Sequence, residues 1–467
     1  MRKAIPLLGE QSTSRVAKVN DQQTINLYPQ AESPSAKSTI TLLSTPGLSK
    51  ITTIGTGPAR ANPVRWKGDL YGVSGSSVWK MNTADTVTIV GTLNTSSGWC
   101  MLAGGRTNLG LVDSTNGYYT DGTTTTQIAD ADFPNGATHI NYLDGRFICA
   151  DINTDQFYIS ADEDITSWAA LDFASAESNP DDILAHITNE KDLYLAGSET
   201  MQVFYNSGNA DFPFSPYPNV IEYGIQSKHS LTKDESGLYM LAIKPGGGIA
   251  VVKITGFQGS QLSSQDETWT INQLTITSDA IGGLYDMKGQ SYYILNFPSE
   301  DLTFAFNTQT GLTHRLKSFG LGRHLGLGYG SLGNRQFVGD YNNAKLYELS
   351  FTKYTDDGGV IERYRRSMII HTNNQRVQYI QVVIDVKTGV GNGDEAAPVM
   401  ELRWSDDGGE SWSSWISKSL GATGVPSTRC IWNRLGTSRG RTFEFRCTDP
   451  VEFQVIDAFA TVEVLSD

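Results

Sequence analysis

The chain has 467 residues, of which 39% are apolar and 18% charged, and its formal net charge is -14 with a pI near 4.9. This apolar content is sufficient for a packed core, and the charge content is too low for a disordered chain. An acidic chain repels phosphate overall, which argues against a protein whose main task is to grip DNA. The 47 glycines, with many Thr, Ser, Tyr and Val residues, favour short strands joined by tight turns. We therefore expect an all-β protein with little helix.

The sequence lacks the usual signals for export. The N-terminus has no apolar run long enough for a signal peptide, and no stretch approaches the roughly 18 apolar residues of a membrane helix. We expect a protein that is made in the cytoplasm and leaves by a route other than secretion, such as lysis. The four cysteines lie far apart and none pairs at a metal-ligand spacing: Cys100, Cys149, Cys430 and Cys447. Reduced thiols are expected, with a Cys430–Cys447 disulfide as the alternative.

Residues 1–36 have no regular pattern, and their polar stretch 30–36 is typical of a loop. We expect an N-terminal arm with one short strand near residues 24–27.

A repeat dominates residues 37–352. Each unit has a turn and a short apolar strand, followed about nine to twelve residues later by a second strand with an aromatic or β-branched pair, as in Leu70 with Trp79 or Phe147 with Tyr158. The first strands recur at intervals of roughly 38 to 54 residues, and alternation within each strand indicates a sheet with one buried face. A period in this range predicts a β-propeller, because radially packed sheets bury one another and a closed ring leaves only short edges. We expect six or seven blades, closed by residues 39–54.

Residues 353–467 lose the blade period. Strands are expected over 377–386, 399–404, 428–435, 442–447 and 459–464, with a Gly/Asp/Asn-rich loop at 389–397. Their short connections favour an antiparallel C-terminal β-sandwich of about 110 residues.

The sharpest local motif is the Asp box at residues 405–412, which runs SDDGGESW. Its aspartate is suited to cap turn amides, its glycine to adopt positive φ and its Trp to pack beneath the turn. In sialidases and other β-proteins this box is structural, and here we interpret it as a hairpin turn.

Other candidate sites have simpler interpretations. The glycine-rich run 320–330 lacks the third glycine of a dinucleotide fingerprint, since position 325 is leucine, and is expected to connect blades. Asp151, Asn153 and Asp155 resemble a calcium loop but lack its glycine and its final glutamate, so a hairpin turn is expected. A basic cluster at Arg363, Arg365 and Arg366 is interpreted as a solvated strand edge, with a local anion-binding patch as the alternative.

No set of residues is put forward as catalytic, cofactor-binding or metal-binding. No nucleophile elbow frames a serine. The six histidines are scattered and are expected to be half-buried strand residues or surface residues: His139, His186, His229, His314, His324 and His371.

The ordered motifs along nearly the whole chain resemble the tail hub (nozzle) proteins of short-tailed bacteriophages, also called packaged-DNA stabilisation proteins. They lie at residues 20–29, 45–48, 130–134, 160–162, 172–177, 180–181, 206–208, 212–214, 221–224, 296–298, 405–412 and 432–436. Two departures are Gln30, where an acidic residue is more usual, and Thr313 before His314, where Trp-His is more usual.

The resemblance implies a structural, non-enzymatic virion protein assembled in the host cytoplasm. Such hubs form a homohexameric ring under the portal-adaptor ring, extend the DNA channel and help to retain the packaged genome. They also dock a tail needle or plug and tailspikes or fibres, and genomic dsDNA passes through them. Because the chain is acidic, we hypothesise a channel wall that lets DNA slide without sticking.

Two rival functions remain open from the sequence. A carbohydrate-binding or sialidase-like β-propeller is suggested by the fold and the Asp box, although arginines are few within the blades. A receptor-binding tip protein is the second rival.

Overall fold

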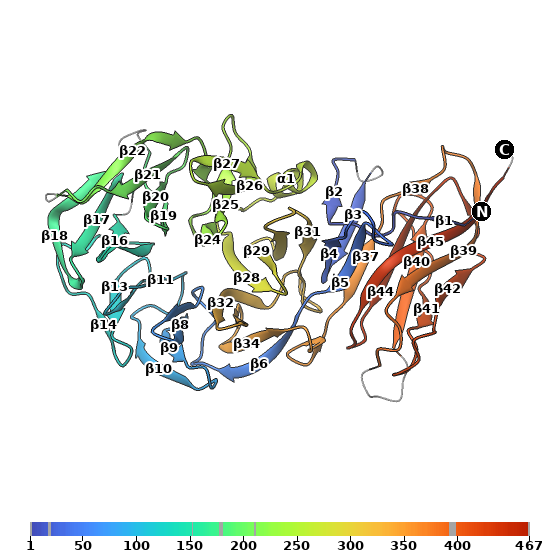
Figure 1. Cartoon of the computed structure of the whole chain (residues 1–467), viewed down its shortest axis with the longest axis horizontal. Coiled ribbons are helices and arrows are strands. Elements are labelled where there is room, and N and C mark those ends of the chain that lie inside the picture. Colours follow the sequence, from blue (N-terminus) through green and yellow to red (C-terminus); the bar gives the residue numbers. More distant parts are fainter. Residues whose placement is uncertain are drawn as a thin grey trace.

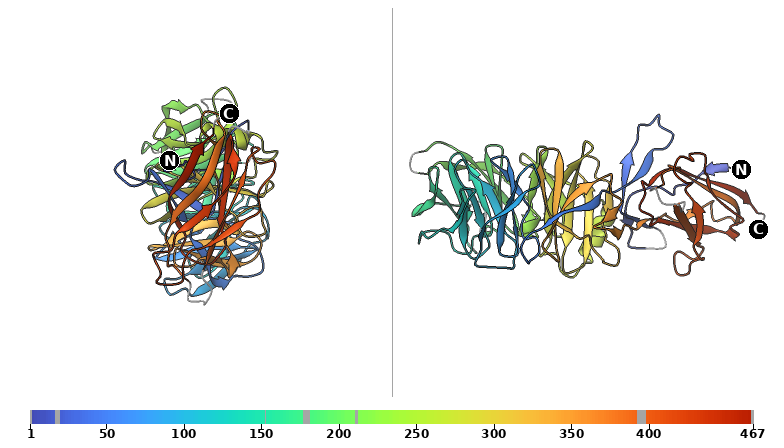
Figure 2. Two further views of the ribbon diagram at one scale, coloured as in Figure 1. Left: turned by 90° about the vertical axis from the view of Figure 1, so that its right-hand side faces the viewer. Right: turned by 90° about the horizontal axis from the view of Figure 1, so that it is seen from below.

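The computed structural model describes residues 2–16, 20–151, 153–176, 181–209, 212–391 and 398–465, and consists of a β-propeller and a β-sandwich placed end to end (Figures 1 and 2). Helix is scarce in these residues, as expected: α1 (Gln265–Asn272) and the short 3-10 helix η1 (Lys228–Ser230). The expectation of an all-β fold is confirmed. In these residues no helix is long and apolar enough to cross a membrane.

Seven sheets surround the propeller axis in the described residues. Blades 1 to 4 consist of β7 (Val64–Trp66), β8 (Asp69–Ser74), β9 (Ser77–Met81) and β10 (Val87–Thr92); β11 (Met101–Gly104), β12 (Leu109–Val112), β13 (Gly117–Thr120) and β14 (Thr125–Gln127); β15 (Ile140–Leu143), β16 (Arg146–Ala150), β17 (Gln156–Ala161) and β18 (Asp164–Ser175); and β19 (Ala185–Asn189), β20 (Asp192–Ala196), β21 (Met201–Asn206) and β22 (Phe214–Ile221).

Blade 5 is irregular, because η1 interrupts its inner strand and both inner pieces pair with β25. The expected count of six or seven blades is thus met by six regular sheets and one irregular sheet. Blades 5 to 7 consist of β23 (Gly224–Ile225), β24 (Thr232–Asp234), β25 (Gly237–Ile243), β26 (Ile249–Thr255) and β27 (Gln258–Gln261); β28 (Ile281–Met287), β29 (Gln290–Phe297), β30 (Leu302–Asn307) and β31 (Thr313–Arg315); and β32 (Gly326–Leu332), β33 (Arg335–Asp340), β34 (Lys345–Ser350) and β6 (Gly47–Thr53).

Local turn chemistry explains how the blades form. In blades 1, 3 and 6 the first two strands are joined by two residues that both have positive φ: Lys67-Gly68 (49° and 93°), Asp144-Gly145 (48° and 88°) and Lys288-Gly289 (54° and 75°). Such turns match the right-handed twist of a hairpin and favour glycine at the second position. The apolar faces then pack between blades, as in the stacked rings of Tyr239 and Tyr293, whose centroids are 5.7 Å apart.

The N-terminal segment closes the ring. Strand β6 pairs antiparallel with β34, with Leu48 opposite Leu349, and so provides the outer strand of blade 7 (Figure 1). The ring closure expected from residues 39–54 is confirmed for β6. The preceding strand β5 (Ile40–Ser44) instead pairs with β4 (Leu27–Ala31) and β45 (Gln454–Val464) in the sandwich.

The rest of the N-terminal segment ties the two bodies together. It contains β1 (Arg2–Ala4), which pairs with β45, and the hairpin of β2 (Ser12–Thr13) and β3 (Asp21–Ile25). Strand β3 pairs with β31 of blade 6 on one side and with β37 (Arg363–Arg366) on the other. One hydrogen-bonded sheet therefore continues from blade 6 into the sandwich.

The sandwich consists of two sheets. One has the order β4-β5-β45-β39-β42, and the other continues from β3 in the order β37-β44-β40-β41. The other strands of the sandwich are β38 (Ile370–His371), β39 (Val377–Val386), β40 (Val399–Ser405), β41 (Ile416–Ser419), β42 (Cys430–Asn433), β43 (Thr437–Ser438) and β44 (Gly440–Cys447). Strands β35 (Thr355–Asp356) and β36 (Gly359–Val360) instead extend the sheet of blade 7, in which β35 pairs with β6. The inner faces bury one apolar core that includes Trp432, Phe443 and Phe445.

Candidate functional site

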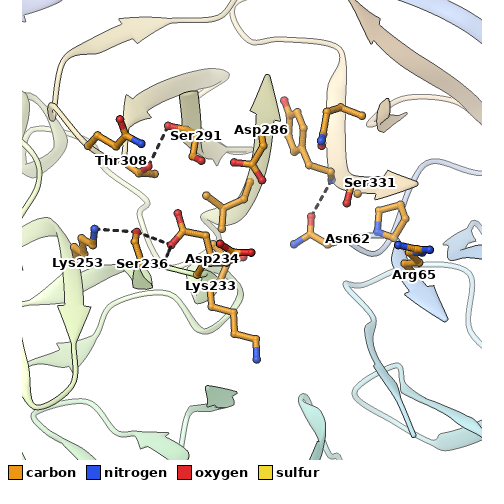
Figure 3. A pocket seen from close by; sticks show the side chains of 18 residues that line it. Asn62, Arg65, Lys233, Asp234, Ser236, Lys253, Asp286, Ser291, Thr308 and Ser331 are labelled. Carbon is orange, nitrogen blue, oxygen red and sulfur yellow. Dashed lines mark hydrogen bonds between the residues drawn. The ribbon is translucent and has the colours of Figure 1, made fainter. Parts of the chain in front are cut away.

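A polar hollow of the propeller opens between blades 1, 5, 6 and 7 (Figure 3). It has a volume of about 600 Å³, and its charged lining consists of Arg65, Lys233, Asp234, Glu235, Lys253 and Asp286. Three cations and three carboxylates thus line the hollow. Most of these side chains are carried by the inner strands and by the turns next to them, because those turns converge on the axis of a propeller.

Hydrogen bonds within the hollow join neighbouring side chains. Lys253 Nζ donates to Ser236 Oγ at 2.9 Å, and Ser236 Oγ donates to Asp234 Oδ1 at 2.7 Å (Figure 3). Lys233 donates to the carbonyl of Thr188, and burial lowers the pKa of its ammonium. A sialidase needs several arginines to grip a carboxylate, whereas Arg65 is the single arginine among the residues that line this hollow. The lining of this hollow therefore fits the binding of a polar ligand better than it fits a sialidase site.

The Asp box forms the expected turn. Asp407 accepts hydrogen bonds from Ser405 Oγ (2.6 Å), from the Ser411 amide (2.9 Å) and from the Ser411 hydroxyl, and Trp412 Nε1 donates to the Gly409 carbonyl at 3.1 Å. These bonds, led by that of Ser405, hold the pKa of Asp407 below its usual range. The box lies in the sandwich, away from the propeller hollow, and its bonds are those of a turn.

The basic cluster is not a solvated strand edge, so that prediction is wrong. Arg363 and Arg365 are fully buried, and Arg366 is half-buried. Arg365 donates to the carbonyls of Leu7 (2.9 Å) and Glu10 (2.7 Å), and also to Gln22 and Thr24. Burial lowers the pKa of Arg365, and the contacts show that its task is to hold the N-terminal segment against the sandwich.

Arg363 serves the same junction from its other side. Its guanidinium donates to the carbonyls of Asp449 (3.0 Å) and Tyr354 (3.3 Å). The alternative of a local anion-binding patch therefore fails for Arg363 and Arg365, because both side chains are fully buried and donate to acceptors inside the protein. The sequence could not show this burial, because the acceptors come from segments up to 358 residues away.

Three histidines meet near the propeller axis, where the sequence had suggested scattered residues. The ring of His139 lies 5.7 Å from that of His186 and 5.6 Å from that of His229, measured between centroids. Burial lowers the pKa of His139 to about 4 and that of His186 to about 3, and that of His229 also falls well below its usual value. Their separations of 47 and 43 residues fall within the range of the blade interval, and this is the signal that could have identified the cluster.

Metal and nucleotide chemistry find no support in the described residues, which contain no group of three or more His, Cys, Asp or Glu able to hold a metal ion. Asp151 and Thr154 lie in a turn closed by hydrogen bonds between Asp151 N and Gln156 O (3.2 Å) and between Thr154 Oγ1 and Asp151 O (3.2 Å). Residues 320–330 contain a blade connection followed by β32, as expected. The four cysteines are free and buried, so the alternative disulfide is absent.

Two family models match the sequence. One is described as the β-propeller of bacteriophage P22 Gp10 and matches residues 3–354, and the other as the β-sandwich of the same protein and matches residues 362–463. No curated protein matches the chain.

Several solved β-structures are similar at low identity. The N-terminal domain of Nup159 (9% identity, TM-score 0.41) covers 70% of this chain and 98% of its own. Virginiamycin B lyase from Staphylococcus aureus has 10% sequence identity and a TM-score of 0.42, and the match covers 65% of this chain and 98% of that one. The WD40 domain of Neurospora crassa Pan2 has 8% sequence identity and a TM-score of 0.41, and the match covers 66% of this chain and 95% of that one. Because the two family models together span most of the chain, this protein belongs to the phage stabilisation family represented by bacteriophage P22 Gp10, a β-propeller followed by a β-sandwich.

Proposed function

We propose that this protein is the tail hub, or nozzle, of a short-tailed phage: a homohexameric ring that continues the DNA channel below the portal-adaptor ring. The observation that carries the proposal is the match of both domains, in order, to a phage stabilisation family. The ring helps to retain the packaged genome, lets it pass during ejection, and docks a needle or plug and tailspikes or fibres. Its role is mechanical and not enzymatic, its place is the virion tail, and its assembly occurs in the host cytoplasm.

The architecture supports a mechanical role. A channel segment must transmit load without hinging, and the continuous sheet from blade 6 through β3 into the sandwich joins the two bodies by backbone hydrogen bonds. The buried Arg365 adds four more bonds across the same junction. The division into an arm (1–36), a propeller (37–352) and a sandwich (353–467) is retained as a proposal, with the arm built into both bodies.

The net charge supports the DNA-channel part of the proposal. A ring of six chains would carry six times the charge of -14, so its surface repels phosphate overall, and tight binding of DNA needs cationic contacts. A map of the assembled channel that shows a lining made mainly of Lys and Arg would contradict this part.

Reconstitution tests the proposal. Purified protein is added to DNA-filled heads that carry the portal and adaptor but lack this chain, and DNA release is followed with a dye that cannot enter closed heads. We expect saturable binding and slower release of DNA. A chain that does not bind these heads but binds or cleaves host surface polysaccharide would support the carbohydrate alternative instead.

A further inference from the structure

The polar hollow between blades 1, 5, 6 and 7 has a buried floor and a charged mouth (Figure 3). Among the residues that line it, Tyr329 is 4% exposed and Gln336 is 7% exposed. Arg65, Glu235 and Asp286 line the same hollow but are exposed. A molecule that enters the hollow therefore meets charged side chains first and the two buried residues last.

The floor is held in place by contacts between blades. Asn62, which precedes β7 of blade 1, donates from Nδ2 to the carbonyl of Gly282 in blade 6 at 2.8 Å. Its Oδ1 accepts from the amide of Tyr329 in blade 7 at 3.0 Å (Figure 3). Tyr329 also stacks on Tyr285 of blade 6, with ring centroids 6.0 Å apart. Because these contacts fix the floor, a ligand does not have to order it on binding, which favours affinity.

Gln336 lies at this floor with an unused side-chain amide. It belongs to β33 of blade 7 and pairs through its backbone with Ser331 of β32. Among the described residues, no group forms a hydrogen bond with its side-chain amide. A buried polar side chain without a partner costs free energy, and the large majority of such groups have one. The amide offers N–H donors and a carbonyl acceptor, which match the carbonyl and the N–H of a peptide group.

The mouth carries unpaired charges of both signs on separate walls. Arg65 comes from β7 of blade 1, Glu235 from the turn after β24 of blade 5, and Asp286 from β28 of blade 6. Within the part of the chain that the structure describes, the side chains of these three residues form neither a hydrogen bond nor an ion pair. A ligand that carries both a positive and a negative group can therefore meet a complementary charge on each wall.

The lining also argues against other classes of ligand. Its three cations and three carboxylates cancel, so neither a polyanion such as DNA nor a polycation is favoured. Tyr329 is the single aromatic residue among the described residues that line the hollow, and its burial leaves little ring face on which a sugar could stack. The volume of about 600 Å³ lies within the range of roughly 300 to 1,000 Å³ that is typical of small-ligand sites. A short peptide with side chains of both charges meets all of these conditions.

We propose that this hollow is a binding site for a short peptide segment that carries one acidic and one basic side chain. A peptide group of the segment pairs with the amide of Gln336 at the floor. The acidic side chain of the segment meets Arg65, and the basic side chain meets Glu235 or Asp286. The inference goes beyond the proposed function and does not depend on it, because all of these residues belong to one chain.

Titration of the purified full-length chain with blocked synthetic peptides tests the site. The probes are acetylated, amidated peptides in which lysine and glutamate are adjacent or separated by one or two glycines. The comparison peptides carry two lysines or two glutamates at the same spacings. By isothermal titration calorimetry we expect at least one mixed-charge probe to bind with a Kd of about 1 mM or tighter, and the like-charge peptides to bind about ten-fold more weakly or not at all. Failure of every mixed-charge probe to bind, or equal binding of the like-charge peptides, would overturn the proposed ligand class.

Three variants assign the binding to the hollow. Gln336→Leu removes the buried amide at similar volume, while Arg65→Gln and Asp286→Asn remove one exposed charge each and should leave the fold unchanged. We expect each to weaken binding of the best mixed-charge probe about ten-fold, whereas Arg376→Gln on the exposed surface of the sandwich should leave it unchanged. Unchanged binding by Arg65→Gln and Asp286→Asn would overturn the assignment to this hollow. Neither result bears on the proposed hub, which the DNA-release experiment tests separately.

Discussion

The blades and the junction between propeller and sandwich are stabilised in different ways. Each blade is built from strands that follow one another closely in sequence, with short turns such as Lys67-Gly68. The junction depends on Arg365, whose acceptors lie more than 340 residues away along the chain. Local rules therefore specify the blades, whereas a few buried polar contacts specify how the two bodies are joined. Substitutions in the two regions should therefore differ in how much they lower the free energy of unfolding.

The largest effect is expected at the junction. Arg365→Met keeps most of the side-chain volume but leaves the carbonyls of Leu7 and Glu10 without their donor inside the protein. We expect a loss of about 4 kcal/mol in the free energy of unfolding, measured with denaturant. The exposed Arg376 provides the matched control, and Arg376→Met should change stability by less than about 0.5 kcal/mol. Equal small effects of both variants would contradict a junction held by Arg365.

Ring closure should give the next largest effect. Leu48 is 2% exposed on β6, the strand that completes blade 7, and Leu48→Ala leaves a cavity at that seam. We expect a loss of about 3 kcal/mol in the free energy of unfolding. Lys50→Ala on the exposed side of the same strand is the control and should be nearly neutral. A neutral Leu48→Ala would mean that β6 contributes little to closing the propeller.

The histidine cluster predicts a pH dependence. His186 is neutral in the folded protein because burial lowers its pKa from 6.5 to about 3. Below pH 6.5 the unfolded chain binds the proton first, so stability falls as the pH falls toward the folded value. In that range His186 should lower the free energy of unfolding by about 1.4 kcal/mol for each unit by which the pH falls. His186→Gln should make the fall less steep, while the exposed His371→Gln should leave it unchanged; denaturant midpoints at several pH values provide the measurement.

A single turn should give the smallest effect. Gly68 has a φ of 93°, and a Cβ atom there would meet no atom within 4 Å, so Gly68→Ala imposes backbone strain alone. We expect a loss of about 1 kcal/mol in the free energy of unfolding. Ser96→Ala in an exposed loop of the propeller is the control. A loss as large as that of Arg365→Met would remove the distinction between blades and junction.

These contrasts also show what the sequence could predict. Alternation, turn residues and the period of about 40 residues indicated the propeller, the sandwich and the ring-closing strand, because these depend on neighbours in sequence. The burial of Arg363 and Arg365 could not be predicted, since a charged run on a strand is usually solvated and the acceptors come from distant segments. The meeting of His139, His186 and His229 was detectable from their blade-period spacing, but their individual surroundings gave no sign of it.

The most direct test of the account is deletion of the gene, followed by electron microscopy of the particles and measurement of their DNA content. If the protein is the hub, the heads should fill, leak their DNA and lack the distal tail, and wild-type protein supplied in trans should restore full particles. Intact, DNA-filled particles with complete tails would contradict the hub assignment.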